Sequence, residues 1–121
     1  MLDVAQAKEF AIRARGQMRE GNNHAAIALL ARSFHALERA DGLEPWDAET
    51  LYHWSVENLR TDAELNCTRF ILSVWNKAGL EELDAEHSNQ LGRFDALDAV
   101  ARWDRIHRVA FATWTADPWW P

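Results

Sequence analysis

Apolar residues recur every three or four positions along most of the chain, which is the spacing of one face of an α-helix. Glycine, proline and helix-capping residues interrupt this pattern and mark where one helix ends and the next begins. The pattern predicts five helices, over residues 3–20, 24–41, 48–60, 62–78 and 94–115. No run of alternating polar and apolar residues indicates a strand. We therefore expect an all-α protein, folded as a compact bundle of about five helices.

The first 42 residues predict a helical hairpin. Small side chains follow one face of its first helix, where they allow close approach of the second: Ala7, Ala11 and Ala14. The turn between the helices and the residues after it, 21–27, resemble the corresponding part of the tetratricopeptide repeat family. The resemblance covers residues 7–40, about a quarter of the chain, and implies a helical hairpin without implying a ligand.

Two capping signals define the middle of the chain. Asp47 is a good N-cap for the helix over 48–60, and Thr61 with Glu64 matches a capping box at the start of the helix over 62–78. The latter helix is apolar on two sides, which predicts that it lies at the centre of the bundle. Cys67 on this helix is then a buried and unreactive thiol. Residues 80–92 are polar and predict a loop with one helical turn.

Length and composition predict one domain over residues 1–121, with the hairpin in 1–42 and three further helices and a tail in 43–121. A single cysteine excludes a disulfide within the chain and fits a reducing compartment. No apolar run approaches the roughly 18 residues of a membrane-spanning helix, and the N-terminus lacks the apolar region of a signal peptide. We expect a cytoplasmic protein.

The net charge is −6 and unevenly distributed. Residues 41–92 hold eleven acidic and three basic residues, a net charge of −8. Nucleic acid is therefore an unlikely partner, because its phosphates are bound through Lys and Arg, and the basic strip of Arg102, Arg105 and Arg108 is short. A basic protein partner would meet the acidic middle of the chain. The alternative is that the negative charge has no specific partner and only keeps the protein in solution.

Seven tryptophans are unusual in 121 residues. Four of them fall outside the predicted apolar faces: Trp46, Trp54, Trp119 and Trp120. Tryptophan is enriched at the energetically dominant positions of protein interfaces, so these residues are candidate partner-binding residues. The alternative for Trp119 and Trp120 is that the tail folds back and caps the helices.

Glu49, His53 and Glu57 are spaced four residues apart on one predicted helix, which suits metal ligation in geometry. They lie opposite the apolar face of that helix, however, and a solvated ladder of charged residues is the interpretation we favour. We expect neither a metal nor another cofactor.

His107 lies within the apolar face of the last predicted helix, and Asp104 precedes it by one turn. A carboxylate that orients a buried imidazole occurs in general bases and beside metal ligands. A buried histidine held by a hydrogen bond is the simpler explanation, and no catalytic motif accompanies the pair.

The leading prediction is a non-enzymatic protein of the adaptor, inhibitor or immunity type. It would bind another protein through exposed tryptophans and the acidic middle region. The alternative is a small hydrolase or metal-dependent enzyme centred on His107 and Asp104. The oligomeric state is left open by the sequence.

Overall fold

The computed structural model describes residues 2–121, and this part of the chain contains six α-helices and no β-strand. The helices are α1 (Val4–Arg19), α2 (Asn23–Arg32), α3 (Ala48–Asn58), α4 (Asp62–Glu86), α5 (Ala96–Arg102) and α6 (Arg105–Ala116), with a short 3-10 helix η1 (His35–Leu37) after α2. The all-α prediction is confirmed, whereas the predicted number of five helices is wrong. None of the helices described is long and apolar enough to cross a membrane.

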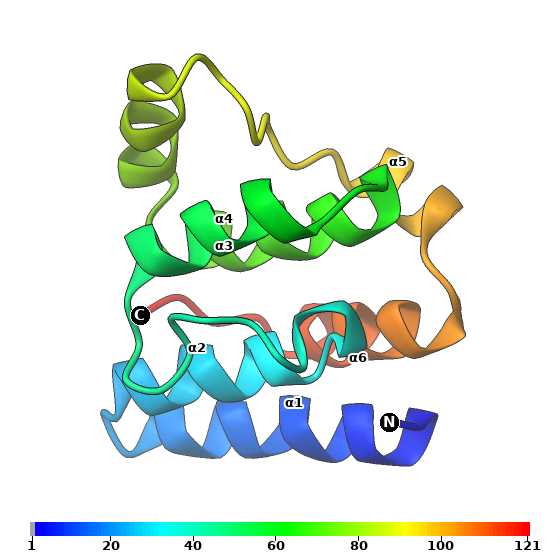
Figure 1. Ribbon diagram of the computed structural model, residues 1–121. Helices are drawn as coiled ribbons and strands as arrows, with labels where there is room; N and C mark the ends of the chain where they lie inside the picture. Colours follow the sequence, from blue (N-terminus) through cyan, green and yellow to red (C-terminus); the bar gives the residue numbers. More distant parts are fainter. Residues whose placement is uncertain (1) are drawn as a thin grey trace.

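The helices lie at three levels in Figure 1, with α1 lowest, α2 and α6 above it, and α3 with the first part of α4 above those. α1 and α2 form the antiparallel hairpin, and α6 packs against α1 as well. α4 contacts α2, α3, α5 and η1. This agrees with the central position predicted for α4. The last helix, α6, lies beside the hairpin, against α1.

The helix predicted over 24–41 ends at Arg32, because the backbone turns to an extended conformation at Phe34. The turn places the Phe34 ring in the core, where it is fully buried between Phe70 and Trp103. It also places His35, the first residue of η1, beside α6. The early end of the helix therefore contributes to the site described below.

The helix predicted to end near Gly79 extends to Glu86, but it is broken at Asn76. The backbone of Asn76 is extended (φ −164°, ψ 95°), and its side-chain Oδ1 accepts a hydrogen bond from the Gly79 amide at 3.1 Å. Asn76 thus acts as the N-cap of a second helical segment, residues 77–86, which we call the arm. The arm turns sharply away from the first part of α4 (Figure 1). The loop predicted over 80–92 is therefore wrong for its first half.

The helix predicted over 94–115 is divided in two at Trp103 and Asp104. The Asp104 side chain accepts a hydrogen bond from the His107 amide at 2.9 Å and so caps α6. Trp103 is buried, and its indole N–H donates to the Ala63 carbonyl at the start of α4 at 2.8 Å. The buried indole of Trp103 and the capping carboxylate of Asp104 thus hold the junction between α5 and α6 against α4.

The buried side chains form one continuous hydrophobic cluster that includes residues of every α-helix. Cys67 lies fully inside it, and burial raises the pKa of its thiol well above the ordinary value. The thiol is therefore neutral and out of contact with solvent, as predicted.

Candidate functional site

The four tryptophans singled out as candidate partner-binding residues differ in exposure. Trp46 and Trp119 are 9% and 5% exposed and belong to the core of this chain. Trp54 is half-buried and packs against the same core. Trp120 is 60% exposed. Trp46 and Trp119 therefore have no surface to offer a partner in this structure, and the tail does fold back, although only Trp119 is covered.

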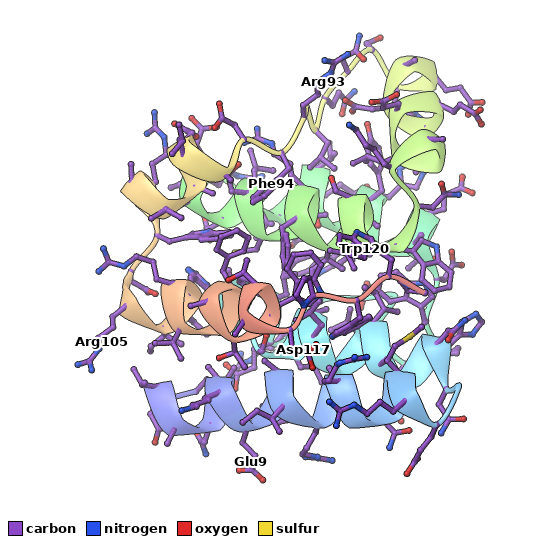
Figure 2. All side chains as sticks on the ribbon, turned by 180° about the vertical axis from the view of Figure 1, so that it is seen from behind. Glu9, Arg93, Phe94, Arg105, Asp117 and Trp120 are labelled. Atoms are coloured by element: carbon purple, nitrogen blue, oxygen red, sulfur yellow. The ribbon has the colours of Figure 1, made fainter. Side chains whose placement is uncertain are left out.

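Trp120 belongs to one of two pairs of partly exposed aromatic side chains that meet on the buried ring of Phe70. It packs edge-to-face on Trp114 at 5.3 Å between ring centroids, and Phe94 and Phe111, the other pair, lie 5.9 Å apart. Three of these rings surround the buried ring of Phe70, at centroid distances of 5.1–5.3 Å. We call the four residues Phe94, Phe111, Trp114 and Trp120 the aromatic surface. Phe94 and Trp120 are on the side of the molecule seen in Figure 2.

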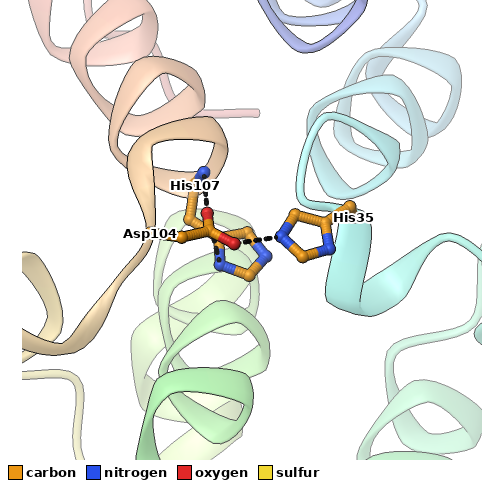
Figure 3. Close-up of side chains that lie close together, drawn as sticks. All are labelled: His35, Asp104 and His107. Atoms are coloured by element: carbon orange, nitrogen blue, oxygen red, sulfur yellow. Dashed lines mark hydrogen bonds and ion pairs between the residues drawn. The ribbon is translucent and has the colours of Figure 1, made fainter. Parts of the chain in front are cut away.

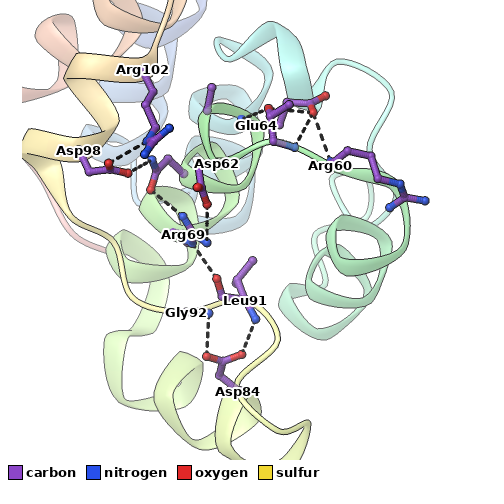
Figure 4. A network of polar contacts seen from close by, with 12 residues as sticks. Arg60, Asp62, Glu64, Arg69, Asp84, Leu91, Gly92, Asp98 and Arg102 are labelled. Atoms are coloured by element: carbon purple, nitrogen blue, oxygen red, sulfur yellow. Dashed lines mark hydrogen bonds and ion pairs between the residues drawn. The ribbon is translucent and has the colours of Figure 1, made fainter.

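A network of polar contacts holds the loop that carries Phe94 (Figure 4). Asp84, at the end of the arm, is buried and accepts hydrogen bonds from the amides of Leu91 (2.8 Å) and Gly92 (2.9 Å). Arg69 on α4 donates to the Leu91 carbonyl at 2.7 Å. Because both the arm and the straight part of α4 bind this loop, Phe94 is held in place from two sides.

The sequence did not indicate the aromatic surface as a unit. Phe111 and Trp114 were assigned to the apolar face of a long helix, and their spacing of three residues is equally typical of a core stripe. Both are half-buried, and each contacts one further ring of the aromatic surface, Phe94 of the loop for Phe111 and Trp120 of the tail for Trp114. The clue available in the sequence was the excess of aromatic residues after position 93.

His35, Asp104 and His107 lie together where η1 meets the start of α6 (Figure 3). The Nε2 atom of His35 is 2.6 Å from one carboxylate oxygen of Asp104, and the Nδ1 atom of His107 is 3.5 Å from the other. The two imidazole rings stack face to face, with centroids 4.0 Å apart and planes inclined by 3°. The structure thus adds His35 to the pair predicted from the sequence.

Both ring nitrogens of His107 face groups of this protein. Nε2 accepts a hydrogen bond from the Ala36 amide at 3.2 Å, so the proton of the neutral ring is on Nδ1, facing Asp104. Burial and, to a lesser extent, the nearby His35 together lower the pKa of His107 from 6.5 to about 4, against the opposing effects of Asp104 and Glu64. His107 is therefore neutral at physiological pH.

The electrostatics of Asp104 complete this arrangement. Burial alone would raise its pKa, but the hydrogen bonds from the His107 amide and the His35 ring outweigh that effect and lower it. Asp104 therefore carries a charge while it caps α6 and binds η1. The cluster fits a structural junction better than a general base, because neither ring nitrogen of His107 is open to a substrate.

The predicted metal ligands on α3 are arranged differently from the sequence expectation. Glu49 Oε1 and His53 Nε2 are 3.6 Å apart, and His87 at the end of the arm joins them. Glu57 is exposed and is not part of this group. His87 was not considered from the sequence, because it lies 34 residues from His53 and only the break at Asn76 brings it near.

In comparisons with known proteins, no family model, curated protein or solved structure matches the chain. A proposal about its function therefore has to come from the fold and the surface described above.

Proposed function

We propose that the chain is a protein-binding domain of the adaptor or inhibitor type, and that the aromatic surface is its contact site. The observation that carries this proposal is the exposure of Trp120, 60% of which is open to solvent while its ring rests on Trp114. A large apolar side chain held in one orientation loses little conformational entropy when a partner covers it. Such residues dominate the binding energy of protein interfaces.

The surroundings of the aromatic surface support the same proposal. Phe70 lies beneath it and packs against Phe94, Phe111 and Trp114, so the rings form a rigid platform. A groove beside Phe94 is lined by Lys77, Arg93 and Glu81, among others. A partner would bury apolar side chains on the rings and place polar groups along this groove.

The acidic middle of the chain would attract a basic partner in this proposal. The arm exposes three glutamates: Glu81, Glu82 and Glu86. We expect a partner with basic residues beside its apolar anchor, because opposite charges at the rim of an interface speed association.

The test is to compare three forms of the tagged chain in its native cells: wild type, Trp120→Ala, and Leu97→Ala as the matched control. Leu97 is 86% exposed on α5 and is not part of the aromatic surface. A specific partner should be captured by wild type and by Leu97→Ala and lost with Trp120→Ala. With the purified partner, Trp120→Ala should weaken binding by about 30-fold, the effect of losing roughly 2 kcal/mol.

The proposal fails if Trp120→Ala captures the same proteins as wild type with unchanged affinity. It also fails if Leu97→Ala abolishes capture as completely as Trp120→Ala does, because the aromatic surface would then not be the site. Light scattering on the purified chain shows whether the captured partner is a second copy of the same protein.

A further inference from the structure

We propose that Glu49 and His53 on α3, together with His87 at the end of the arm, form a binding site for a divalent transition-metal ion, with zinc as the expected ion. Each residue offers one donor atom, and these atoms lie within 4.8 Å of one another. Two imidazole nitrogens and one carboxylate oxygen are a donor set that zinc takes in proteins, with a fourth position left to water.

The geometry needs only small adjustments. Zinc binds these donors at about 2.0–2.2 Å, so tetrahedral ligands are about 3.4 Å apart. Glu49 Oε1 and His53 Nε2 are already 3.6 Å apart. The ring of His87 is perpendicular to that of His53, at 4.7 Å between centroids, and must approach by a change of rotamer. Because the side chains of Glu49 and His53 are 67% and 44% exposed, they can turn without displacing the core.

The donors are also available. Within residues 2–121, the ring nitrogens of His53 and His87 make no hydrogen bond to protein groups beyond the 3.6 Å contact with Glu49. His107 in the other cluster differs, because its Nε2 is occupied by the Ala36 amide. Of the two histidine clusters, the one at the arm is therefore the one whose nitrogens are free to bind an ion.

The position of the site gives the ion a structural consequence. Next to His53, the Tyr52 hydroxyl donates to Asp84 on the arm at 2.8 Å, so α3 and the arm already touch there. An ion bound by Glu49, His53 and His87 would fasten the end of the arm to α3. Because the arm is a separate helical segment after the break at Asn76, the ion would add a second link between it and α3, beside the hydrogen bond from Tyr52 to Asp84. The arm has four acidic residues and one lysine, which favours a cation.

The experiment is isothermal titration of the full-length protein with Zn²⁺. We expect one saturable equivalent in wild type, and at least about a tenfold loss of affinity in His53→Ala and in His87→Ala. Glu57→Gln is the matched control, since Glu57 is also four residues from His53 on α3, and should bind as wild type does. Circular dichroism of each variant confirms that the helices are retained.

A second measurement distinguishes this site from loose binding to surface histidines. Zinc should slow amide hydrogen exchange in residues 77–87 of wild type and not of His87→Ala. The absence of saturable binding would overturn the proposal. So would binding that is unchanged in His87→Ala, or binding that His35→Ala abolishes, because the ion would then be held elsewhere.

Discussion

The buried histidine at position 107 makes a specific prediction about acid stability. Its pKa is about 4 in the folded protein and 6.5 in an exposed histidine, chiefly because burial disfavours the charged ring. A histidine whose folded pKa is depressed takes up its proton more readily when unfolded. His107 therefore has no effect on the free energy of unfolding above about pH 6.5, and it lowers this free energy as the pH falls from there towards 4.

The size of this effect follows from the two pKa values. Protonation of the unfolded chain at this residue costs about 2 kcal/mol of stability at about pH 5 and almost nothing at pH 7. The loss approaches about 3 kcal/mol below pH 4. Asp104 does not offset the loss in this window, because its pKa is lowered and it stays charged until lower pH.

The assay is urea denaturation at pH 7 and at pH 5, for wild type and for His107→Gln. The variant cannot be protonated, so wild type should lose about 2 kcal/mol more than the variant between the two pH values. At pH 7 the variant is itself less stable by roughly 1 kcal/mol if its amide oxygen replaces Nε2 as the acceptor for Ala36 imperfectly. His24→Gln is the control, because His24 is exposed, and it should behave as wild type does.

An equal dependence on pH in wild type and in His107→Gln would refute the reasoning. It would mean that the ring of His107 is either solvated or already charged in the folded protein. If His107→Gln kept the fold but abolished an activity found for the protein, the enzyme alternative would replace the structural role given to this residue here.

Two further predictions concern the loop and the turn that position the arm and α3. Asp84→Ala should destabilise the protein by about 3–5 kcal/mol, because it leaves the Tyr52 hydroxyl, the buried Leu91 amide and the part-buried Gly92 amide without an acceptor, whereas Tyr52→Phe should cost only about 1–2 kcal/mol. Urea denaturation measures both, and similar values for the two variants would contradict the assignment of Asp84 as the shared acceptor. Gly42→Ala should cost about 3 kcal/mol or more, since Gly42 has a φ of +87° and an added Cβ would lie 2.6 Å from the Leu51 amide nitrogen. Gly21→Ala is its control: φ is +81° but the space is free, so the loss should stay near 1 kcal/mol, and a thermal shift equal to that of Gly42→Ala would show that the contact does not matter.

The helical class and most of the helix starts could be predicted from the sequence because they depend on local interactions. The capping box of Thr61 and Glu64 and the N-cap of Asp47 act within one turn of their own helices, and the structure contains both. The burial of Cys67 followed from the apolar period around it. Two helix ends were wrong where a short polar side chain can lie inside a helix or act as an N-cap: one changed the number of helices, and the other changed where the fourth helix bends and ends.

Asn76 and Asp104 are the two such residues. Each lies within a pattern of helical period, and in each case the side chain caps a new helix instead of continuing the old one. What decides between the two is packing at a distance: Trp103 binds the Ala63 carbonyl beside the second break, and Asp84 ties the arm to Tyr52 after the first. Neither contact is visible in a local window of sequence.

The sequence by itself therefore determined an all-helical chain, the places where most helices begin, and the abundance of tryptophan. Only the tertiary structure decided which aromatic rings are exposed. Trp119 and Trp120 are neighbours in the sequence, yet the first is buried and the second is exposed, because this depends on what the tail packs against. Only the tertiary structure likewise brought His87 to Glu49 and His53, and His35 to Asp104. These groupings join residues more than thirty positions apart, and such contacts depend on how whole helices pack rather than on the preferences of any one segment.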